Sequence, residues 1–332
     1  MGNLPEDRFV GNRAFLICGV DFCGPIYTTL RIRGKQPIKT YIAVFVCFAT
    51  KAVHLEAVNE LSTDAFLCTL NRFIGRRGLP RKIWCDNGRN FVGSANLLNG
   101  QILGAKDQEK IQQSSAQRGI DFQFIPPRAP NFGGLWEAAV KSAKYLLLRA
   151  TANANLTYED LTTVLVDIEA ILNSRPIGMM TDDPSDGECL TPGHFLIGTS
   201  MKAIPTIQEP QLNLNLVKRY QMLSCLRDRF WRSWLQDYVL EQQQRTKWVQ
   251  TSKNVQPGTL VMIHEDNIAP QKWLVGKIVK TISGSDGQVR VAEILTKMGL
   301  CKRPIRKLAP LPILDNLQPS SYDEPCNVGD VK

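Results

Sequence analysis

Three acidic residues, Asp21, Asp86 and Glu137, have types and positions that could support phosphodiester chemistry together. Asp21 and Asp86 each follow a short apolar run, and Glu137 falls in the first turn of a predicted helix after a Gly-Gly pair. A carboxylate at the end of an apolar strand is costly unless a cation compensates it. Two Mg²⁺ or Mn²⁺ ions would compensate three such carboxylates, because hard oxygen ligands suit these metals. The metal pair would activate a water or hydroxyl and stabilise the leaving oxygen.

Each acid taken alone also has a simpler interpretation. A strand-end aspartate can face water, and a glutamate in a first helical turn complements the helix dipole. Short motifs match by chance often enough that the neighbouring residues must decide. Asp121 is a rival for the third position, but it opens a predicted strand, so we expect a structural role for it.

The elements that must position these acids follow from the hydrophobic pattern. Two continuous apolar runs, 14–20 and 41–48, predict strands that are buried on both faces, and the first of them ends at Asp21. An alternating stretch predicts a third strand, antiparallel to the second. That third strand is 52–58. It is followed by helix 63–74 capped by Ser62 or Thr63, strand 82–85, a polar helix within 93–116, strand 122–125, and helices 135–150 and 158–173. This order predicts an α/β domain with a mixed sheet.

The rest of the chain predicts a different architecture. Residues 177–250 read as a linker followed by a long helix over 214–244, and residues 251–310 read as a small all-β barrel with strands 260–263, 273–279 and 289–295. Residues 1–13 would be an N-terminal arm and 311–332 a disordered tail. With the core at 14–176, the length of 332 residues suits two domains.

Composition narrows the choice of partners and location. The net charge is +9, and the 245–310 region supplies most of it, with twelve Lys and Arg against four Asp and Glu. This excess favours a polyanion such as nucleic acid. No apolar run reaches the roughly 20 residues of a membrane span, and no signal peptide is apparent, so we expect a nuclear or cytoplasmic protein. Nine scattered cysteines without a C-x-x-C pair, and three histidines, argue against a zinc site.

Three segments occur in one order: Val20-Asp21-Phe22-Cys23-Gly24-Pro25, Trp84-Cys85-Asp86-Asn87-Gly88-Arg89-Asn90-Phe91 and Pro130-Asn131-Phe132-Gly133-Gly134-Leu135-Trp136-Glu137. They resemble the catalytic signatures of retroviral and retrotransposon integrases. The stretch 156–176, with Ile171-Leu172-Asn173-Ser174-Arg175-Pro176, resembles the BEL/Pao class of long-terminal-repeat retrotransposons. The region 255–310 is similar to the domain that follows the core in that class.

This resemblance implies an RNase H-like five-stranded mixed sheet, followed by a small SH3-like β-barrel. It implies 3′-end processing of transposon DNA and then strand transfer into target DNA. Asp21 and Asp86 would hold one metal ion, and Asp21 and Glu137 the other. No small-molecule cofactor or membrane partner is implied, but double-stranded DNA and a homo-oligomer are.

Several basic or polar residues are candidate DNA contacts. Lys141 and Lys144 lie on the predicted Glu137 helix and match lysines that hold the DNA end in the resembled integrases; the alternative is a solvated helix face. The other candidates are Asn87, Lys272, Lys277 and Arg303. The barrel could equally bind a peptide or chromatin with Trp273 as anchor, and 302–307 could be a nuclear signal. The aromatic stripe Phe230, Trp231, Trp234 and Tyr238 is expected to be core, and His54 structural.

Two departures from the integrase pattern keep other functions open. The 50 residues between Asp86 and Glu137 exceed the retroviral spacing, and the surplus falls in the polar 93–116 segment. The upstream His-His-Cys-Cys zinc domain of such integrases is not expected in this chain. A truncated or domesticated DNA-binding relic is therefore the alternative function. An RNase H-type nuclease is a third.

Overall fold

The computed structural model describes residues 7, 13–103, 119–125, 144–151, 154–180, 189–202, 214–243, 254–266, 268–285 and 287–311. Contacts divide the chain into two units. The first comprises residues 1–175, 191–244 and 264–273, and the second comprises 176–190, 245–263 and 274–332. No helix in the described ranges is long and apolar enough to cross a membrane.

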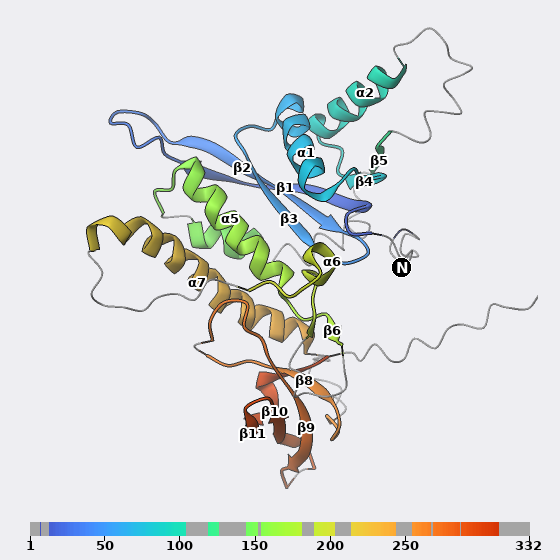
Figure 1. Ribbon diagram of the computed structural model, residues 1–332, viewed down its shortest axis with the longest axis vertical. Helices are drawn as coiled ribbons and strands as arrows, with labels where there is room; N and C mark the ends of the chain where they lie inside the picture. Colours follow the sequence, from blue (N-terminus) through green and yellow to red (C-terminus); the bar gives the residue numbers. More distant parts are fainter. Residues whose placement is uncertain are drawn as a thin grey trace, which may run out of the picture. The chain divides into compact units, whose positions relative to one another are not determined.

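The first unit is built on a five-stranded sheet with the order β3-β2-β1-β4-β5 (Figure 1). Its strands are β1 (Ile17–Thr28), β2 (Ile38–Cys47), β3 (Val53–Val58), β4 (Lys82–Cys85) and β5 (Asp121–Phe124). The first three strands are antiparallel neighbours, whereas β4 pairs in parallel with both β1 and β5. The predicted RNase H-like mixed sheet is confirmed by this order.

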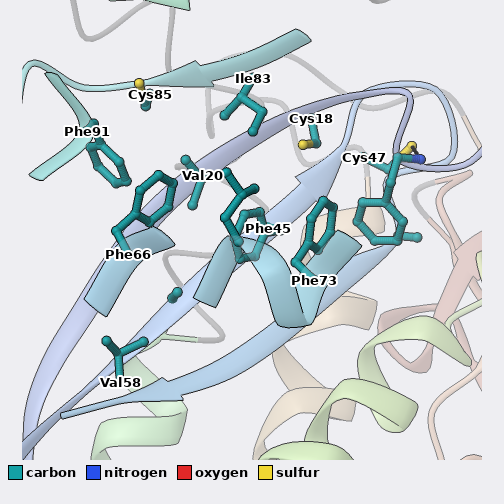
Figure 2. Packing of buried hydrophobic residues seen from close by; sticks show 14 residues of the cluster. Cys18, Val20, Phe45, Cys47, Val58, Phe66, Phe73, Ile83, Cys85 and Phe91 are labelled. Carbon is teal, nitrogen blue, oxygen red and sulfur yellow. Dashed lines mark hydrogen bonds between the residues drawn. The ribbon is translucent and has the colours of Figure 1, made fainter. Parts of the chain in front are cut away.

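The core lies between this sheet and helix α1 (Thr63–Arg77) (Figure 2). Phe66, Leu70 and Phe73 of α1 are at most 2% exposed, and Phe45 of β2 stacks on Phe73 with ring centroids 4.2 Å apart. Alternate β2 residues on the opposite face, such as Val44, are also buried. The expectation of a strand buried on both faces is therefore confirmed for β2.

Local sequence sets the limits of α1. The Ser62 hydroxyl accepts a hydrogen bond from the Ala65 N–H (3.2 Å), so Ser62, one of the two predicted candidates, is the N-cap. Gly78 ends the helix with φ of 85°, a conformation that favours glycine, and its N–H bonds to the Ile74 carbonyl.

Helix α5 (Tyr158–Asn173) covers the outer edge of β3 with side-chain hydrogen bonds. Asn173 accepts from the Val53 N–H (2.8 Å) and donates to the Val53 carbonyl (2.7 Å). Glu169 accepts from the Leu55 N–H (2.8 Å), and the Tyr158 hydroxyl donates to the Ala57 carbonyl (2.9 Å). These helix residues lie near one stripe of α5, so the helix occupies backbone groups that an edge strand would otherwise expose.

His54 lies on the α1 side of β3 and is 2% exposed. Its imidazole lies 3.1 Å from a carboxylate oxygen of Glu56 and 3.1 Å from one of Glu169. Burial alone would lower the pKa of His54, but the two carboxylates outweigh burial and hold the pKa above its usual value. The expected structural role of His54 agrees with this buried position.

Three expectations from the sequence are corrected. The first strand does not end at Asp21 but continues to Thr28, because a bulge between Cys23 and Ile26 lets pairing with β2 resume. Helix α2 (Arg89–Leu103) begins before residue 93. The predicted linker that begins at residue 177 contains short elements, β6 (Gly178–Met179), β7 (Cys189–Leu190) and α6 (His194–Ile197), and its Met179 is buried at 2% exposure.

The second unit is a small antiparallel sheet with the order β11-β10-β9-β8-β12. Its elements are β8 (Leu260–Ile263), β9 (Leu274–Ser283), β10 (Val289–Thr296), β11 (Gly299–Pro304), the 3₁₀ helix η2 (Ile305–Lys307) and β12 (Leu308–Pro310). Five antiparallel strands with a 3₁₀ turn before the last confirm the predicted SH3-like topology. The basic run 302–307 lies within β11 and η2, so it is part of the folded sheet.

Helix α7 (Leu214–Gln242) belongs to the first unit and carries the aromatic stripe. Phe230, Trp231, Trp234 and Tyr238 are at most 7% exposed, which confirms the expectation of core. Trp273 comes back to α7 from the connection between β8 and β9. Its ring meets Trp231 edge-on at 5.0 Å, and its Nε1 donates to the Ser174 hydroxyl (3.1 Å). Trp273 is thus a packing residue here.

Candidate active site

Strand register brings Asp21 and Asp86 to the same level. In the parallel pair β1 and β4, Gly19 lies opposite Trp84. Asp21 is two positions beyond Gly19, and Asp86 is two positions beyond Trp84. Asp86 directly follows the last residue of β4, and neighbouring strands lie about 4.8 Å apart, so the register places the two acids at the same level of adjacent strands. The geometry therefore brings together two of the three predicted acids.

Asp21 is held beside a cation. One carboxylate oxygen accepts from the Phe22 N–H (2.7 Å), and the other forms an ion pair with the Lys144 ammonium. The Lys144 side chain is only 17% exposed and the Asp21 side chain 33%. The partly buried ammonium thus compensates the Asp21 charge, as an anion at this position requires. Sequence reasoning expected Lys144 to contact DNA and did not foresee this pair.

The turn after β4 holds Asp86 through a backbone hydrogen bond and is itself tied to β5. Asp86 is exposed, and its Oδ1 accepts from the Gly88 N–H (2.9 Å). The Asn87 amide donates to the Ile125 carbonyl (2.7 Å), which ties the turn to the end of β5. A Cβ on Gly88 would lie 2.9 Å from the Asp86 Oδ1 and 2.7 Å from the Asn90 Oδ1. Glycine is therefore needed for the carboxylate to approach the backbone this closely.

Buried aromatic rings anchor both acid-bearing segments. Phe22 follows Asp21 and stacks on Phe91 with centroids 5.3 Å apart, and Phe91 meets Phe66 of α1 edge-on at 4.8 Å. Phe91 itself is 2% exposed and lies in α2, the helix that follows the Asp86 turn. Because one ring contacts the neighbours of both acids, core packing limits their relative movement.

Asp121 lies at the far end of the sheet from this pair. It opens β5 opposite Lys82, whereas Cys85, beside Asp86, lies opposite Phe124. Three strand positions place Asp121 about 10 Å from the end where Asp86 lies. Its carboxylate accepts from the Gln123 side chain (3.0 Å). These positions agree with a structural role for Asp121.

Glu137 and Lys141 lie outside the described residues. Residues 144–151 are helical and place Lys144 at Asp21. Within the described part of the chain, no group of three or more His, Cys, Asp or Glu side chains gathers for a metal ion. The Asp21 and Asp86 carboxylates nevertheless provide hard oxygen donors, and the Lys144 ammonium occupies a cation position beside one of them. This donor set fits Mg²⁺ or Mn²⁺.

The predicted DNA contacts in the C-terminal half do not form one cluster. Lys272 belongs to the first unit, whereas Lys277 and Arg303 belong to the second. Lys277 lies opposite Leu295, and Arg303 lies opposite Ala292. These two β10 residues are three positions apart. Because side chains alternate along a strand, Lys277 and Arg303 project from opposite faces of the sheet. Lys302, which sequence reasoning did not select, shares the Lys277 face and binds Glu293 (3.0 Å).

Comparison with known proteins adds a family match and two likenesses to solved structures. A model described as a family of unknown function (DUF5641) matches residues 218–311. The chain is similar to the simian T-cell lymphotropic virus intasome in complex with the PP2A regulatory subunit B56 gamma, at 14% identity and a TM-score of 0.36, over 95% of this chain and 85% of that chain.

It is also similar to the HTLV-2 integrase catalytic core domain in complex with magnesium (trimeric form). The identity is 17% and the TM-score 0.34, over 56% of this chain and 99% of that chain. No curated protein matches the chain. At these identities and TM-scores neither likeness assigns an activity. The chain's own strand order and carboxylate pair define an RNase H-like core with a candidate acidic site.

Proposed function

We propose that this protein is a metal-dependent polynucleotidyl transferase of the integrase type, from a retrotransposon of the BEL/Pao class, that processes DNA 3′ ends and joins them to target DNA. The observation that carries the proposal is the level placement of Asp21 and Asp86 on adjacent parallel strands, with the Lys144 ammonium at Asp21. Carboxylate oxygens are the ligands that Mg²⁺ and Mn²⁺ prefer, and a bound metal ion would replace the Lys144 ammonium as the cation beside Asp21.

The third ligand of the proposed site is Glu137. Lys144 lies seven residues after Glu137, which is close to two turns of a helix, so the two side chains would share a face if the predicted helix 135–150 is continuous. Seven residues of helix rise about 10 Å, so Glu137 would lie two turns before Lys144 on the helix face that contacts Asp21. Bound Mg²⁺ or Mn²⁺ would activate the attacking oxygen and stabilise the leaving oxygen.

The chain's own residues would position the DNA and the ligands. Asp86 is held by the Gly88 N–H and Asp21 by the Phe22 N–H, so both carboxylates are oriented before any substrate binds. Lys144, once released from Asp21, could bind a phosphate of the DNA end. Lys141, Asn87, Lys272, Lys277 and Arg303 remain proposed DNA contacts. Because two DNA ends must be joined to the target, the active form would be an oligomer. The protein would act in the nucleus, where the target DNA lies.

A disintegration assay on a branched DNA oligonucleotide tests the proposal, because it reverses strand transfer within one substrate. We expect Mn²⁺- or Mg²⁺-dependent resealing by the wild-type chain. Asp86→Asn should lower the rate at least about 1000-fold while DNA binding persists, because a metal ligand is lost. Asp121→Asn is the matched control, since this acid lies at the far end of the sheet, and it should retain the wild-type rate.

Other outcomes separate the alternative functions. DNA binding without resealing in any variant would contradict the enzyme and support a DNA-binding relic. Metal-dependent cleavage of an RNA–DNA hybrid without resealing of branched DNA would support an RNase H-type nuclease. Equal rates for Asp86→Asn and wild type would overturn the site assignment.

A further inference from the structure

The β1–β2 hairpin extends beyond the five-stranded sheet as a two-stranded ribbon, residues 26–40, here called the β1–β2 arm. β1 pairs with β4 only over Ile17–Gly19, and β2 pairs with β3 only over Tyr41–Val46. The pairs Ile26–Thr40, Tyr27–Lys39 and Thr28–Ile38 therefore have no third strand. Figure 1 shows the hairpin projecting from the sheet beside α5.

The base of the arm is fixed to the start of α5. The Thr29 N–H donates to the Leu156 carbonyl (2.8 Å), and the Arg31 guanidinium binds the Asp160 carboxylate (2.9 Å). Asp160 is 0% exposed and also belongs to the capping box of α5. An isolated two-stranded hairpin is only marginally stable in water. These anchors therefore give the arm a defined direction.

The arm is strongly basic. Residues 26–40 contain Arg31, Arg33, Lys35 and Lys39 and no acidic residue. Arg31 is taken by Asp160, whereas the other three are exposed and form no ion pair with a described residue. Gly34 has φ of 79°, and the Lys35 N–H bonds to the Ile32 carbonyl, so a tight turn brings Arg33 and Lys35 together. The end of the arm is thus a local positive site.

Large apolar side chains are exposed between these cations. Tyr27 is 56% exposed, Leu30 51%, Ile32 58% and Ile38 40%. Tyr27 lies directly opposite Lys39 in the ribbon, so an aromatic ring and an ammonium share one face. Phosphates pair with cations, while sugars and base edges offer apolar contacts in the grooves, so this mixture fits a nucleic-acid duplex.

The arm and the candidate active site are parts of one strand. Thr28 lies seven positions along β1 from Asp21, which corresponds to at most about 23 Å at about 3.3 Å per residue. The exposed cations lie farther out, beyond Thr28. A DNA duplex advances about 3.4 Å per base pair, so a duplex of about 30 base pairs is roughly 100 Å long. This length is enough to contact both the candidate active site and the end of the arm.

We infer that the β1–β2 arm is a second DNA-binding element, which binds the phosphate backbone of a duplex through Arg33, Lys35 and Lys39. The inference rests on the proposed function insofar as the duplex is the one processed at Asp21 and Asp86. It adds a backbone contact well away from the metal site, on an element that the DNA-contact candidates from the sequence did not include.

The test measures binding of a labelled duplex by fluorescence anisotropy in metal-free buffer, at several salt concentrations. The variant is the triple Arg33→Ala, Lys35→Ala, Lys39→Ala, which leaves the Arg31 anchor in place. Each phosphate contact contributes about 0.9 to the slope of log K against log salt. We therefore expect the slope to become shallower by about 2 to 3. The control triple Arg81→Ala, Lys202→Ala, Lys218→Ala removes the same charge from exposed positions elsewhere and should change the slope by less than about 1.

A charge-preserving triple, Arg33→Lys, Lys35→Arg, Lys39→Arg, should keep the wild-type slope and separates charge from folding. An arm variant with the wild-type slope overturns the inference. The inference is also overturned if the arm variant loses self-association in sedimentation velocity while its salt slope stays at the wild-type value. The arm would then be a contact between copies of the chain. The disintegration assay is read separately: a reduced slope in a chain that never reseals DNA would support the arm and contradict the proposed function.

Discussion

At the scale of single residues, the site depends on small groups that allow close approach. Gly88 donates its N–H to Asp86 and has no side chain to displace the carboxylate. Asp21 is not left as an isolated charge, because the Lys144 ammonium lies against it. Two carboxylates can therefore lie level on neighbouring strands before metal binds, at a cost that a single lysine reduces.

Gly88→Ala tests this close approach. The added Cβ would lie under 3.0 Å from side-chain oxygens of Asp86 and Asn90. Both oxygens can rotate away, so we expect the free energy of unfolding to change by less than about 1 kcal/mol. The resealing rate should fall about 10- to 100-fold because the Asp86 carboxylate is displaced.

The matched control for Gly88 is Gly75→Ala in α1, where nothing lies within 4 Å of the new Cβ. This helix-interior change should stabilise the protein by about 0.5 to 1 kcal/mol and leave the rate unchanged. Comparable rates for the two alanine variants would show that Asp86 does not need the Gly88 turn.

At the scale of elements, helix α5 supplies hydrogen-bond partners to the backbone groups of β3, as a further strand of the sheet would. Its polar side chains occupy backbone groups along the outer edge, and its apolar face lies in the core. An edge strand with free backbone groups invites pairing with another chain. The helix therefore protects this side of the sheet while its start anchors the β1–β2 arm.

Asn173→Ala tests the edge cover. The change leaves both the Val53 N–H and the Val53 carbonyl without their partner at a position that is 0% exposed. We expect a loss of about 2 to 4 kcal/mol in the free energy of unfolding, measured by urea denaturation, because each unsatisfied buried group costs about 1 to 3 kcal/mol.

Val166→Ala is the control on the same helix, since Val166 is 56% exposed. It should change stability by no more than about 0.5 kcal/mol. If Asn173→Ala is as mild as the control, the hydrogen bonds to β3 do not stabilise the sheet.

At the scale of the whole molecule, the two units are not consecutive in the chain. Residues 264–273, which connect β8 and β9 of the second unit, belong to the first unit. Within the first unit, Trp273 packs on Trp231 and Tyr238. The family match over residues 218–311 covers most of α7 and the second sheet as one stretch. A single cut between α7 and β8 would therefore take Trp273 away from the first unit.

The variant Trp273→Ala measures how much the packing of residues 264–273 contributes to the free energy of unfolding of the first unit. Loss of two edge-on ring contacts and the bond to Ser174 should lower the free energy of unfolding by about 2 to 3 kcal/mol. The neighbouring Lys272→Ala is exposed and should leave it within about 0.5 kcal/mol. A chain ending at residue 244 should show a lowered melting temperature similar to Trp273→Ala, and an unchanged one would contradict the packing role.

The sequence by itself determined the element types and the order of the core. Continuous apolar runs predicted β2 and the first part of β1, and helical spacing predicted α5 over the residues it occupies. Ser62 or Thr63 marked the start of α1. These features follow from local backbone preference and periodicity, which the chain carries in short windows. The carboxylate candidates could be named for the same reason, since each stands in a short recognisable segment.

Only the tertiary structure decided which of these residues meet. The level placement of Asp21 and Asp86 depends on the register of two strands far apart in sequence, and Lys144 reaches Asp21 across 123 positions. The continuation of β1 past Asp21 and the return of Trp273 to α7 likewise depend on partners that no local window contains. Non-local pairing is selected by the packing of the whole core, so local periodicity cannot specify it.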